Sequence, residues 1–251
     1  MYALVTGASS GIGLEIAKLL AKKHYNLILA ARRKKRLLYL KKQLESKYNI
    51  SVKVIECDLS KEESCYQLCD EIKELDVTVL VNNAGFGKVG HFDTIPLEDE
   101  IDMIHTNIVA PHILTKWFVK EKDSGNILNV ASMAGFQPGP VMAAYGATKA
   151  YLLNLSIAVN YELEKSNKNI HVTTLCPGPV DTEFSRTANV KFSLKGMQSR
   201  DVALYAIRCM FRKKLVIVPG LQMKLAHAGE RFVPDKILLR IAYHFQKKKE
   251  G

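Results

Sequence analysis

No apolar run in the sequence approaches the roughly 18 to 20 residues that a helix needs to span a bilayer, so we expect no transmembrane segment. The first residues, MYALVTG, lead directly into a strand-like run without the basic and long apolar regions of a secretory signal. The five cysteines are odd in number and show no paired zinc spacing, which favours reduced thiols. Together these absences predict a cytoplasmic protein.

The chain also lacks low-complexity tracts, short-period repeats and any Pro/Gly/Ser-rich linker that would divide it. With 251 residues and 47% hydrophobic composition it can bury a full core, so we expect a single domain over residues 1–251. None of the seven histidines has a partner at ligand spacing, and no metal site is predicted.

Acidic residues are scarce in two parts of the chain, and these parts account for its net charge of +11. Residues 31–53 contain nine cations and one carboxylate, and residues 208–251 contain eleven cations and three carboxylates. The remainder is slightly acidic, which argues against an evenly basic surface that coats DNA, so nucleic acid is not the expected partner. Each basic region forms either a solvated face or the site of a smaller anion.

Short runs rich in Val, Ile and Leu recur along the chain, each separated from the next by enough residues for a helix. The seven runs are YALVT, NLILAA, VKVIEC, VTVLVN, NILNV, HVTTLC and LVIVP. Strands this uniformly apolar are buried on both faces, which calls for helices above and below a parallel sheet. The sequence therefore predicts an α/β Rossmann fold, a doubly wound sheet of about seven strands with its ligand crevice at their carboxyl ends.

A glycine-rich turn, TGASSGIG at residues 6–13, follows the first expected strand and precedes a helix expected from Leu14 to Leu20. Glycine permits a tight turn and lets backbone N–H groups approach a pyrophosphate, which the positive end of the following helix attracts. No Gly-Lys-Ser/Thr follows, so the turn is not a P-loop. Taken alone, the turn is equally compatible with a purely structural role.

The second expected strand, NLILAA, ends at a run of cations where a dinucleotide-binding fold places the adenosine ribose. An acidic residue here would accept from the ribose 2′-hydroxyl, whereas arginine pairs with a 2′-phosphate. Arg32 and Arg33 occupy the position and no carboxylate does. We therefore expect NADP(H) as the cofactor, with the following Lys34, Lys35 and Arg36 on a solvated helix face.

Tyr145 and Lys149 lie four residues apart in AAYGATKAYLLNL, one turn apart on the same face of an expected helix. A phenol with a pKa of about 10 exchanges protons poorly at neutral pH, and a neighbouring ammonium favours its phenolate. Such a helix face is common and usually has no function. Two further strand ends favour a functional site here, however. The expected strand ILNVAS ends with Ser132, and VNNAG at residues 81–85 ends with its own glycine turn, so both place residues at the expected ligand crevice.

With these motifs in order along nearly the whole chain, the sequence resembles the short-chain dehydrogenase/reductase family. TGASSGIG is similar to its cofactor loop, NNAG to its fourth-strand motif, and PGPVDT, residues 177–182, to its nicotinamide-side loop. The catalytic residues implied by the resemblance are Asn107, Ser132, Tyr145 and Lys149. The implied cofactor-binding residues are Gly7, Ser9, Ser10, Gly11, Ile12, Gly13, Arg32, Arg33, Asp58, Leu59, Asn83, Ala84, Gly85, Tyr145, Lys149, Pro177, Gly178, Val180 and Thr182.

The family mechanism implies a role for each catalytic residue. Ser132 would hydrogen-bond the substrate carbonyl, while Tyr145 would donate a proton to the carbonyl oxygen in reduction or remove it in oxidation. Lys149 would lower the pKa of Tyr145 and hold the nicotinamide ribose. Asn107 would anchor a water that relays protons from solvent to Lys149.

One position departs from the pattern of the family. The glycine loop has Ser10 where some NADP-using relatives carry a basic residue, so phosphate recognition would rest on Arg32 and Arg33. The resemblance implies an oxidoreductase that transfers a hydride between NADP(H) and a carbonyl compound or secondary alcohol. An NADP(H)-binding redox sensor without turnover is the alternative, although such proteins often lose the tyrosine or the lysine, and both are present here.

Substrate contacts are expected from the least constrained segments, residues 86–96, 133–142 and 183–200, the last acting as a substrate loop. The large apolar residues of these segments would give a mostly apolar pocket; they are Met133, Phe136, Met142 and Phe184. The pocket favours an apolar ketone or a 3-oxoacyl group over a sugar. The sequence as a whole most resembles the broad-range ketone and 3-oxoacyl reductases of the family.

Residues 220–251 are expected to form a basic helical extension. Its last part spaces apolar residues as in a helix and ends in cations, with Ile237, Leu238, Ile241, Ala242 and Phe245 followed by Lys247, Lys248 and Lys249. We favour a helix that packs on its own domain or on a partner subunit, and peripheral contact with an anionic membrane is the alternative. The resemblance also implies a homodimer or homotetramer.

Overall fold

The computed structural model describes residues 1–166, 168–184, 196–230 and 233–247. Its centre is a parallel seven-stranded sheet with the strand order β3-β2-β1-β4-β5-β6-β9. In chain order these strands are β1 (Tyr2–Thr6), β2 (Asn26–Ala31), β3 (Val52–Glu56), β4 (Val77–Asn82), β5 (Ser124–Val130), β6 (Asn169–Leu175) and β9 (Val216–Ile217). All seven expected strands occur, and β1, β2 and β4 begin and end at the expected residues.

Apolar residues on both faces explain why these runs form a central sheet. In β1, the side chains of Ala3 and Val5 belong to one core and that of Leu4 belongs to the other, and all three are fully buried. Successive side chains of a strand alternate between the two faces, so an unbroken apolar run requires cover on each side.

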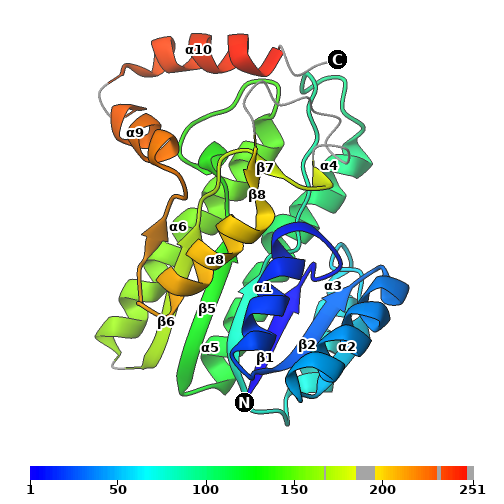
Figure 1. The fold of residues 1–251 in the computed structure, drawn as a ribbon. Coiled ribbons are helices and arrows are strands. Elements are labelled where there is room, and N and C mark those ends of the chain that lie inside the picture. The colour runs from blue at the N-terminus through cyan, green and yellow to red at the C-terminus, as the bar shows by residue number, and fades with distance from the viewer. Residues whose placement is uncertain (167, 185–195, 231–232, 248–251) are drawn as a thin grey trace.

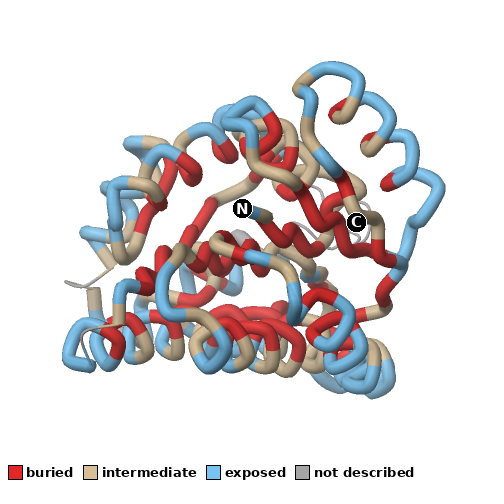
Figure 2. The backbone as a smooth tube through the Cα atoms, turned by 90° about the horizontal axis from the view of Figure 1, so that it is seen from below, coloured by how far each residue is buried: buried red, intermediate tan, exposed pale blue. Residues whose placement is uncertain are grey.

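Six helices supply that cover in two layers (Figure 1). The helices that pack on the first core are α1 (Gly11–Lys22), α2 (Lys34–Tyr48) and α8 (Ser199–Met210). Those on the second core are α3 (Glu62–Ile72), α5 (Ala110–Glu121) and α6 (Ala143–Lys165). Figure 2 shows the buried residues where helices and sheet face one another and the exposed residues on the outer sides. The predicted single-domain, doubly wound Rossmann fold is confirmed.

The strand order reverses at β1, whose neighbours are β2 and β4. In open α/β sheets the crevice for a ligand lies at the carboxyl ends of the strands beside such a reversal. The turn after β1 and the turn after β4 therefore meet at the edge where a dinucleotide would be held.

The remaining elements lie at or near this carboxyl end. They include a small sheet that the sequence did not predict, and are β7 (Val180–Asp181), β8 (Met197–Gln198), α4 (Leu97–Ile104), the π-helical turn η1 (His105–Val109), the 3-10 turn η2 (Met133–Gly135), α9 (Leu221–Glu230) and α10 (Asp235–Lys247). In Figure 1, α9 and α10 lie beyond the strand ends at the top of the molecule. Among the described segments, no helix combines the length and the apolar character that a membrane crossing requires.

Candidate active site

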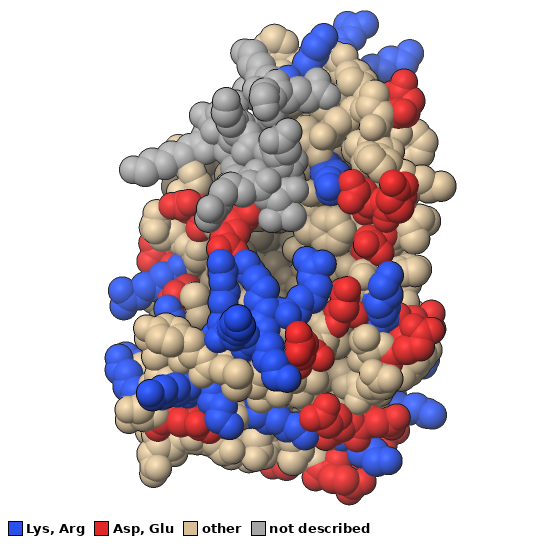
Figure 3. All heavy atoms as spheres, turned by 90° about the vertical axis from the view of Figure 1, so that its right-hand side faces the viewer, with Lys and Arg blue, Asp and Glu red and all other residues tan. Residues whose placement is uncertain are grey.

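A cleft of about 560 Å³ opens at the carboxyl ends of the strands. Every site residue predicted from the sequence lines it except Gly13 and Asn107. Figure 3 shows Lys and Arg side chains gathered around a hollow on this side of the molecule, and Arg32 and Arg33 are among the residues that line the cleft. The fold thus brings together residues that lie as far apart in the sequence as Gly7 and Thr182.

The glycine loop adopts a conformation that glycine favours. The φ angles are +63° at Gly7 and +57° at Gly11, in the left-handed region that side chains rarely enter. The Gly7 N–H donates to the Ala30 carbonyl oxygen at 2.8 Å, which ties the turn to the end of β2. A Cβ atom at Gly7 would lie 2.8 Å from Asn83 Nδ2, so the turn also leaves no room for one.

Gly13 acts behind the loop rather than in the cleft. A Cβ atom there would lie 2.3 Å from Asn83 Nδ2 and 2.6 Å from the Gly7 carbonyl oxygen. The first turn of α1 can therefore approach the end of β4 only because residue 13 has no side chain. The structure places Gly13, which we predicted among the cofactor contacts, in a packing role.

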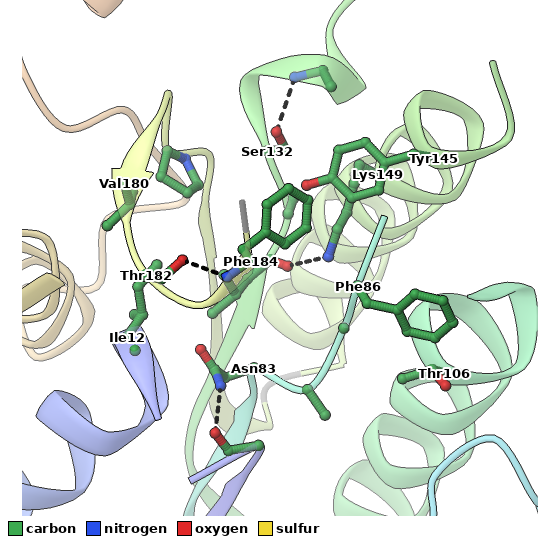
Figure 4. A pocket seen from close by; sticks show the side chains of 18 of the residues that line it. Ile12, Asn83, Phe86, Thr106, Ser132, Tyr145, Lys149, Val180, Thr182 and Phe184 are labelled. Atoms are coloured by element: carbon green, nitrogen blue, oxygen red, sulfur yellow. Dashed lines mark hydrogen bonds between the residues drawn. The ribbon is translucent and has the colours of Figure 1, made fainter. Parts of the chain in front are cut away.

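Hydrogen bonds join the end of β1 to the turn after β4. Asn83 Nδ2 donates to the Thr6 carbonyl oxygen at 3.0 Å, and the Thr6 hydroxyl donates to the Val81 carbonyl oxygen at 3.1 Å. The same hydroxyl accepts from the N–H groups of Asn83 and Ala84 at 3.0 and 3.1 Å. Figure 4 shows Asn83 in this position at the base of the pocket. The NNAG turn is thereby fixed against the glycine loop.

Arg33 is held by three side chains at the far end of the cleft. Its guanidinium donates to the hydroxyls of Ser9 at 2.9 Å and Ser10 at 2.6 Å, and it pairs with the Glu183 carboxylate at 2.5 Å. Ser10 thus contributes to this site through Arg33, although it carries no charge. The position expected to receive an anion already faces a carboxylate of the protein itself.

Arg36 also pairs with Glu183, at 2.8 Å, which sequence reasoning missed. Arg36 lies on an exposed face of α2, as predicted, and the first turn of that helix also directs it at Glu183 on the cleft rim. Hydrogen bonds from Arg33 and Arg36 lower the pKa of Glu183 to about 2. No local pattern in the sequence signals this pairing, because 147 residues separate Arg36 from its partner.

Tyr145, Lys149 and Ser132 converge at the other end of the cleft, as Figure 4 shows. Tyr145 and Lys149 are 8% and 5% exposed on α6, and the Lys149 Nζ lies 5.8 Å from the centre of the Tyr145 ring. Lys149 donates to the Val130 carbonyl oxygen at 2.9 Å. Ser132 lies two residues after the end of β5, and its hydroxyl accepts from the Ala134 N–H at 3.1 Å.

Burial dominates the protonation of this group. It raises the pKa of Tyr145 to about 12, although hydrogen bonding with Ser132 lowers it. Burial also lowers the pKa of Lys149 to about 8. The protein groups by themselves therefore do not lower the Tyr145 pKa as predicted, because loss of solvation disfavours the phenolate more than its neighbours favour it. At neutral pH, Tyr145 carries its proton and Lys149 is mostly charged.

Asn107 stands behind the cleft wall in the π-helical turn η1 and is 1% exposed. Its Nδ2 donates to the Phe86 carbonyl oxygen at 2.9 Å and to the Thr148 hydroxyl at 3.0 Å. Its Oδ1 accepts from the Phe86 N–H at 3.1 Å. A Cβ atom on Gly85 would meet both Asn107 Oδ1, at 2.9 Å, and Lys149 Nζ, at 3.2 Å. Asn107 therefore fixes the irregular segment after β4 that passes in front of Lys149.

The part of the cleft beside Tyr145 is largely apolar. Met133, Met142 and Phe184 line it as predicted, and the Phe184 ring lies 5.5 Å from that of Tyr145. Phe136 does not line this cleft, and its ring stacks on His227 at 3.8 Å instead. Residues 185–195 of the predicted substrate loop, residues 248–251 and the Phe245 side chain lie outside the described residues.

Sequence reasoning missed the lining residues contributed by the C-terminal helices and the loop before α6. The residues from the C-terminal helices are Met223, Ala226, Glu230 and Gln246, while Gln137 lies in the segment 133–142 that was expected to contact the substrate but was not itself predicted. The amphipathic pattern of α10 was the available signal, and it did not indicate what the helix covers. All five cysteines are free thiols, and no cluster of three or more potential metal ligands occurs in the described part of the chain.

Comparisons with known proteins agree with this fold and site. The model of the short chain dehydrogenase family matches residues 1–191, and the chain belongs to that family. A short-chain dehydrogenase from Sphingobium yanoikuyae, solved in complex with NADPH, superposes with a TM-score of 0.83 at 32% identity and covers 92% of this chain and 93% of its own.

Two curated relatives differ in how much of their length is matched. An "NADP-dependent 3-hydroxy acid dehydrogenase" from Schizosaccharomyces pombe is 33% identical over 90% of this chain and 93% of the relative. A "Very-long-chain 3-oxoacyl-CoA reductase" from Candida glabrata is 34% identical over 68% of this chain and 54% of the relative. The chain thus spans about half the length of several curated relatives that it matches.

Proposed function

We propose that this chain is an oxidoreductase that transfers a hydride between NADP(H) and a carbonyl compound or secondary alcohol. The observation that carries the proposal is one continuous cleft with Arg32 and Arg33 at one end and Ser132, Tyr145 and Lys149 at the other. The NADPH complex of the Sphingobium yanoikuyae relative and the NADP dependence of the Schizosaccharomyces pombe relative support it.

The residues present fit a dinucleotide. Gly7 and Gly11 adopt positive φ angles and carry no side chain in the turn at the start of α1, so backbone N–H groups of a helix N-terminus can face a pyrophosphate there. Arg33 and Arg36 place two guanidinium groups at one carboxylate, an arrangement that also suits a phosphate. When bound, the nicotinamide supplies the hydride that is exchanged with the carbonyl carbon.

The chain's own residues position and protonate the substrate. The Ser132 hydroxyl would hydrogen-bond the carbonyl oxygen, and the Tyr145 hydroxyl would donate its proton to that oxygen as negative charge develops there. A Tyr145 pKa of about 12 keeps this proton in place at neutral pH. Lys149 holds a positive charge beside Tyr145, which favours the phenolate left after transfer.

We propose an apolar ketone or a 3-oxoacyl compound as the substrate. Met133, Met142 and Phe184 surround the space in front of Tyr145 with apolar surface. The names of the two curated relatives point to 3-oxoacyl and 3-hydroxy acid chemistry in those proteins.

An NADPH oxidation screen over aldehydes, ketones and 3-oxoacyl thioesters tests this function. The control is Tyr145→Phe, which keeps the buried ring and removes only the proton donor. We expect it to bind NADPH like the parent and to lose about 100-fold to 10,000-fold in kcat, the range typical of a general acid. Near-native kcat in the variant on a confirmed substrate would show that Tyr145 is not the proton donor.

A homodimer or homotetramer in the cytoplasm also belongs to the proposal. Support for an oligomer comes from the outer face of α6, where Tyr151, Ile157 and Tyr161 are exposed. Support for a reducing compartment comes from the five free cysteines. Light scattering of the purified chain tests the first statement, and cell fractionation tests the second.

A further inference from the structure

Beyond its apolar part, the cleft reaches a cluster of polar side chains that the proposed chemistry does not use. Gln137 follows η2, Glu230 ends α9 and Gln246 lies near the end of α10, and all three line the cleft. The same three residues also line a second cavity of about 400 Å³ between α9 and α10. They therefore stand at the junction of the two spaces.

The two carboxamides at this junction are incompletely satisfied. The side-chain oxygens of Gln137 and Gln246 are buried and accept no hydrogen bond from any residue that the structure describes. Buried polar atoms almost always have a partner, because leaving one without a hydrogen bond costs free energy. A partner from outside the chain would remove that cost.

Glu230 gives the junction a negative charge that is only partly balanced. Its carboxylate lies 3.6 Å from His227 Nδ1, and its side chain is 19% exposed. Burial raises the pKa of Glu230, and His227 opposes the shift. The His227 ring stacks on Phe136, which fixes the pair beside the cleft. A second carboxylate brought to this place would be repelled, whereas a hydrogen-bond donor would be attracted.

The surroundings of the junction are apolar on both sides. Met133, Met142 and Phe184 line the cleft toward Tyr145, and Val233, Leu238 and Ile241 line the second cavity. A ligand that reaches from Tyr145 to the junction must therefore be apolar along most of its length and polar at one remote point.

We propose that Gln137, Glu230 and Gln246 form a specificity subsite that selects apolar carbonyl substrates carrying a hydroxyl or amide N–H remote from the reacting carbonyl, and that disfavours substrates with a free carboxylate there. The inference rests on the proposed function and narrows it. An apolar ketone whose far end carries a hydroxyl or a secondary amide satisfies this rule, whereas a long-chain oxo acid whose carboxylate reaches the junction does not.

Binding of a matched ligand series tests the subsite without turnover. The ligands are straight-chain methyl ketones of increasing length that end in a methyl, a hydroxyl or a carboxylate group. Their Kd values are measured by titration calorimetry on protein saturated with NADP⁺, which cannot reduce them. At the chain length that reaches the junction, we expect the hydroxyl compound to bind about tenfold more tightly than the methyl compound and the carboxylate compound about tenfold more weakly.

Variants assign these differences to named side chains. Glu230→Gln should remove most of the penalty against the carboxylate compound while leaving the methyl compound within about twofold. Gln137→Leu and Gln246→Leu should each reduce the preference for the hydroxyl compound, and they keep the test open if Glu230→Gln does not fold. The matched control is Glu63→Gln, an exposed glutamate on α3, which should change none of the Kd values.

The outcomes separate the subsite from the function. Equal Kd values for the three end groups at every length, no binding by any of them, or an unchanged ranking in all three subsite variants would overturn the inference. The expected ranking without reduction by NADPH would leave the subsite standing and contradict the proposed function. Reduction of the ketones by NADPH with equal Kd values for the three end groups would support the proposed function and contradict the subsite.

Discussion

Residues from distant segments fix the conformation of Arg33, the side chain expected to bind an anion. Its guanidinium contacts Ser9, Ser10 and Glu183, so its conformation is fixed before any ligand arrives. A side chain that is already ordered loses less entropy on binding, which favours affinity for a phosphate placed against it. A 2′-phosphate in this place would meet Arg33 and Arg36 in competition with the Glu183 carboxylate.

Replacing Arg32 and Arg33 together with alanine should raise the KM for NADPH at least tenfold and change the KM for NADH little. The reason is that a guanidinium pairs with the 2′-phosphate, often through two charge-assisted hydrogen bonds, and NADH lacks that group. Steady-state kinetics with both cofactors on one substrate measure the effect. Equal KM values for NADPH and NADH in the parent protein would contradict the assignment.

Lys149 gives a pH dependence that reports on the catalytic end of the cleft. Its pKa is lowered to about 8 by burial, so the side chain loses its charge as pH rises through that value. The arginines stay charged throughout this range. We expect kcat/KM for NADPH, which reports the free protein, to be level near pH 7 and to fall by up to about tenfold per pH unit above pH 8.

The control for this profile is Lys149→Arg, whose guanidinium does not titrate below pH 10. Whatever its absolute rate, its kcat/KM for NADPH should stay level to pH 9.5 where that of the parent falls. A parent profile that is level to pH 9.5 would show that the charge of Lys149 does not limit cofactor binding.

At the scale of elements, α1 approaches the turns after β1 and β4 so closely at Gly13 that no side chain fits between them. Gly13→Ala should lower the free energy of unfolding by about 1–3 kcal/mol, because overfilling a packed contact forces the backbone to shift. Gly229→Ala on α9 is the matched control, since a Cβ atom there would meet nothing within 4 Å. It should be neutral or stabilising by up to about 1 kcal/mol, as alanine favours a helix. Urea unfolding of both variants measures the difference, and equal destabilisation would contradict the packing role of Gly13.

The elements also show how far the sequence predicts this molecule. Each of the seven sheet strands contains Val, Ile or Leu, and the strands were predictable from the sequence because burial on both faces favours apolar residues at successive positions. The two-residue strands β7 and β8 carry no such pattern, because their pairing depends on where the preceding turn is held. The position of α10 was not predictable either, since an amphipathic pattern gives the apolar face of a helix without its partner.

Within the candidate site, too, some residues were predictable from the sequence and others were not. The glycine loop, Ser132 and the Tyr145–Lys149 pair were predicted because each lies at a strand end or helix start that the pattern fixes. Glu183, Gln137 and Glu230 were not predicted as individual contacts, because each reaches the cleft from an element placed only by tertiary packing. The residues that the chemistry requires were therefore more predictable than those that shape the substrate space.

At the scale of the whole molecule, the C-terminal segment closes the end of the cleft that lies opposite the adenosine side. Ala242 of α10 is 8% exposed, Gln246 lines the cleft, and Leu238 lines the cavity beneath the helix. Ile237 and Ile241 are nevertheless 48% and 46% exposed. The helix therefore rests on its own domain with part of its apolar surface and presents the rest outward.

Truncation after Phe232 distinguishes a packed lid from a membrane contact. Because α10 covers substrate space rather than the glycine loop, we expect the shortened chain to bind NADPH as before and to show a KM for carbonyl substrates raised about tenfold or more. Its thermal midpoint should fall by only a few degrees, since α10 adds little to the two cores on the sheet. The membrane contact would instead be favoured by two results together. The full chain would sediment with anionic vesicles at low salt while the shortened chain does not, and the KM would be the same for both. The outward-facing Ile237, which lines neither the cleft nor the second cavity, makes that alternative worth testing, and Ile237→Lys in the full chain should then abolish vesicle binding while leaving the KM unchanged.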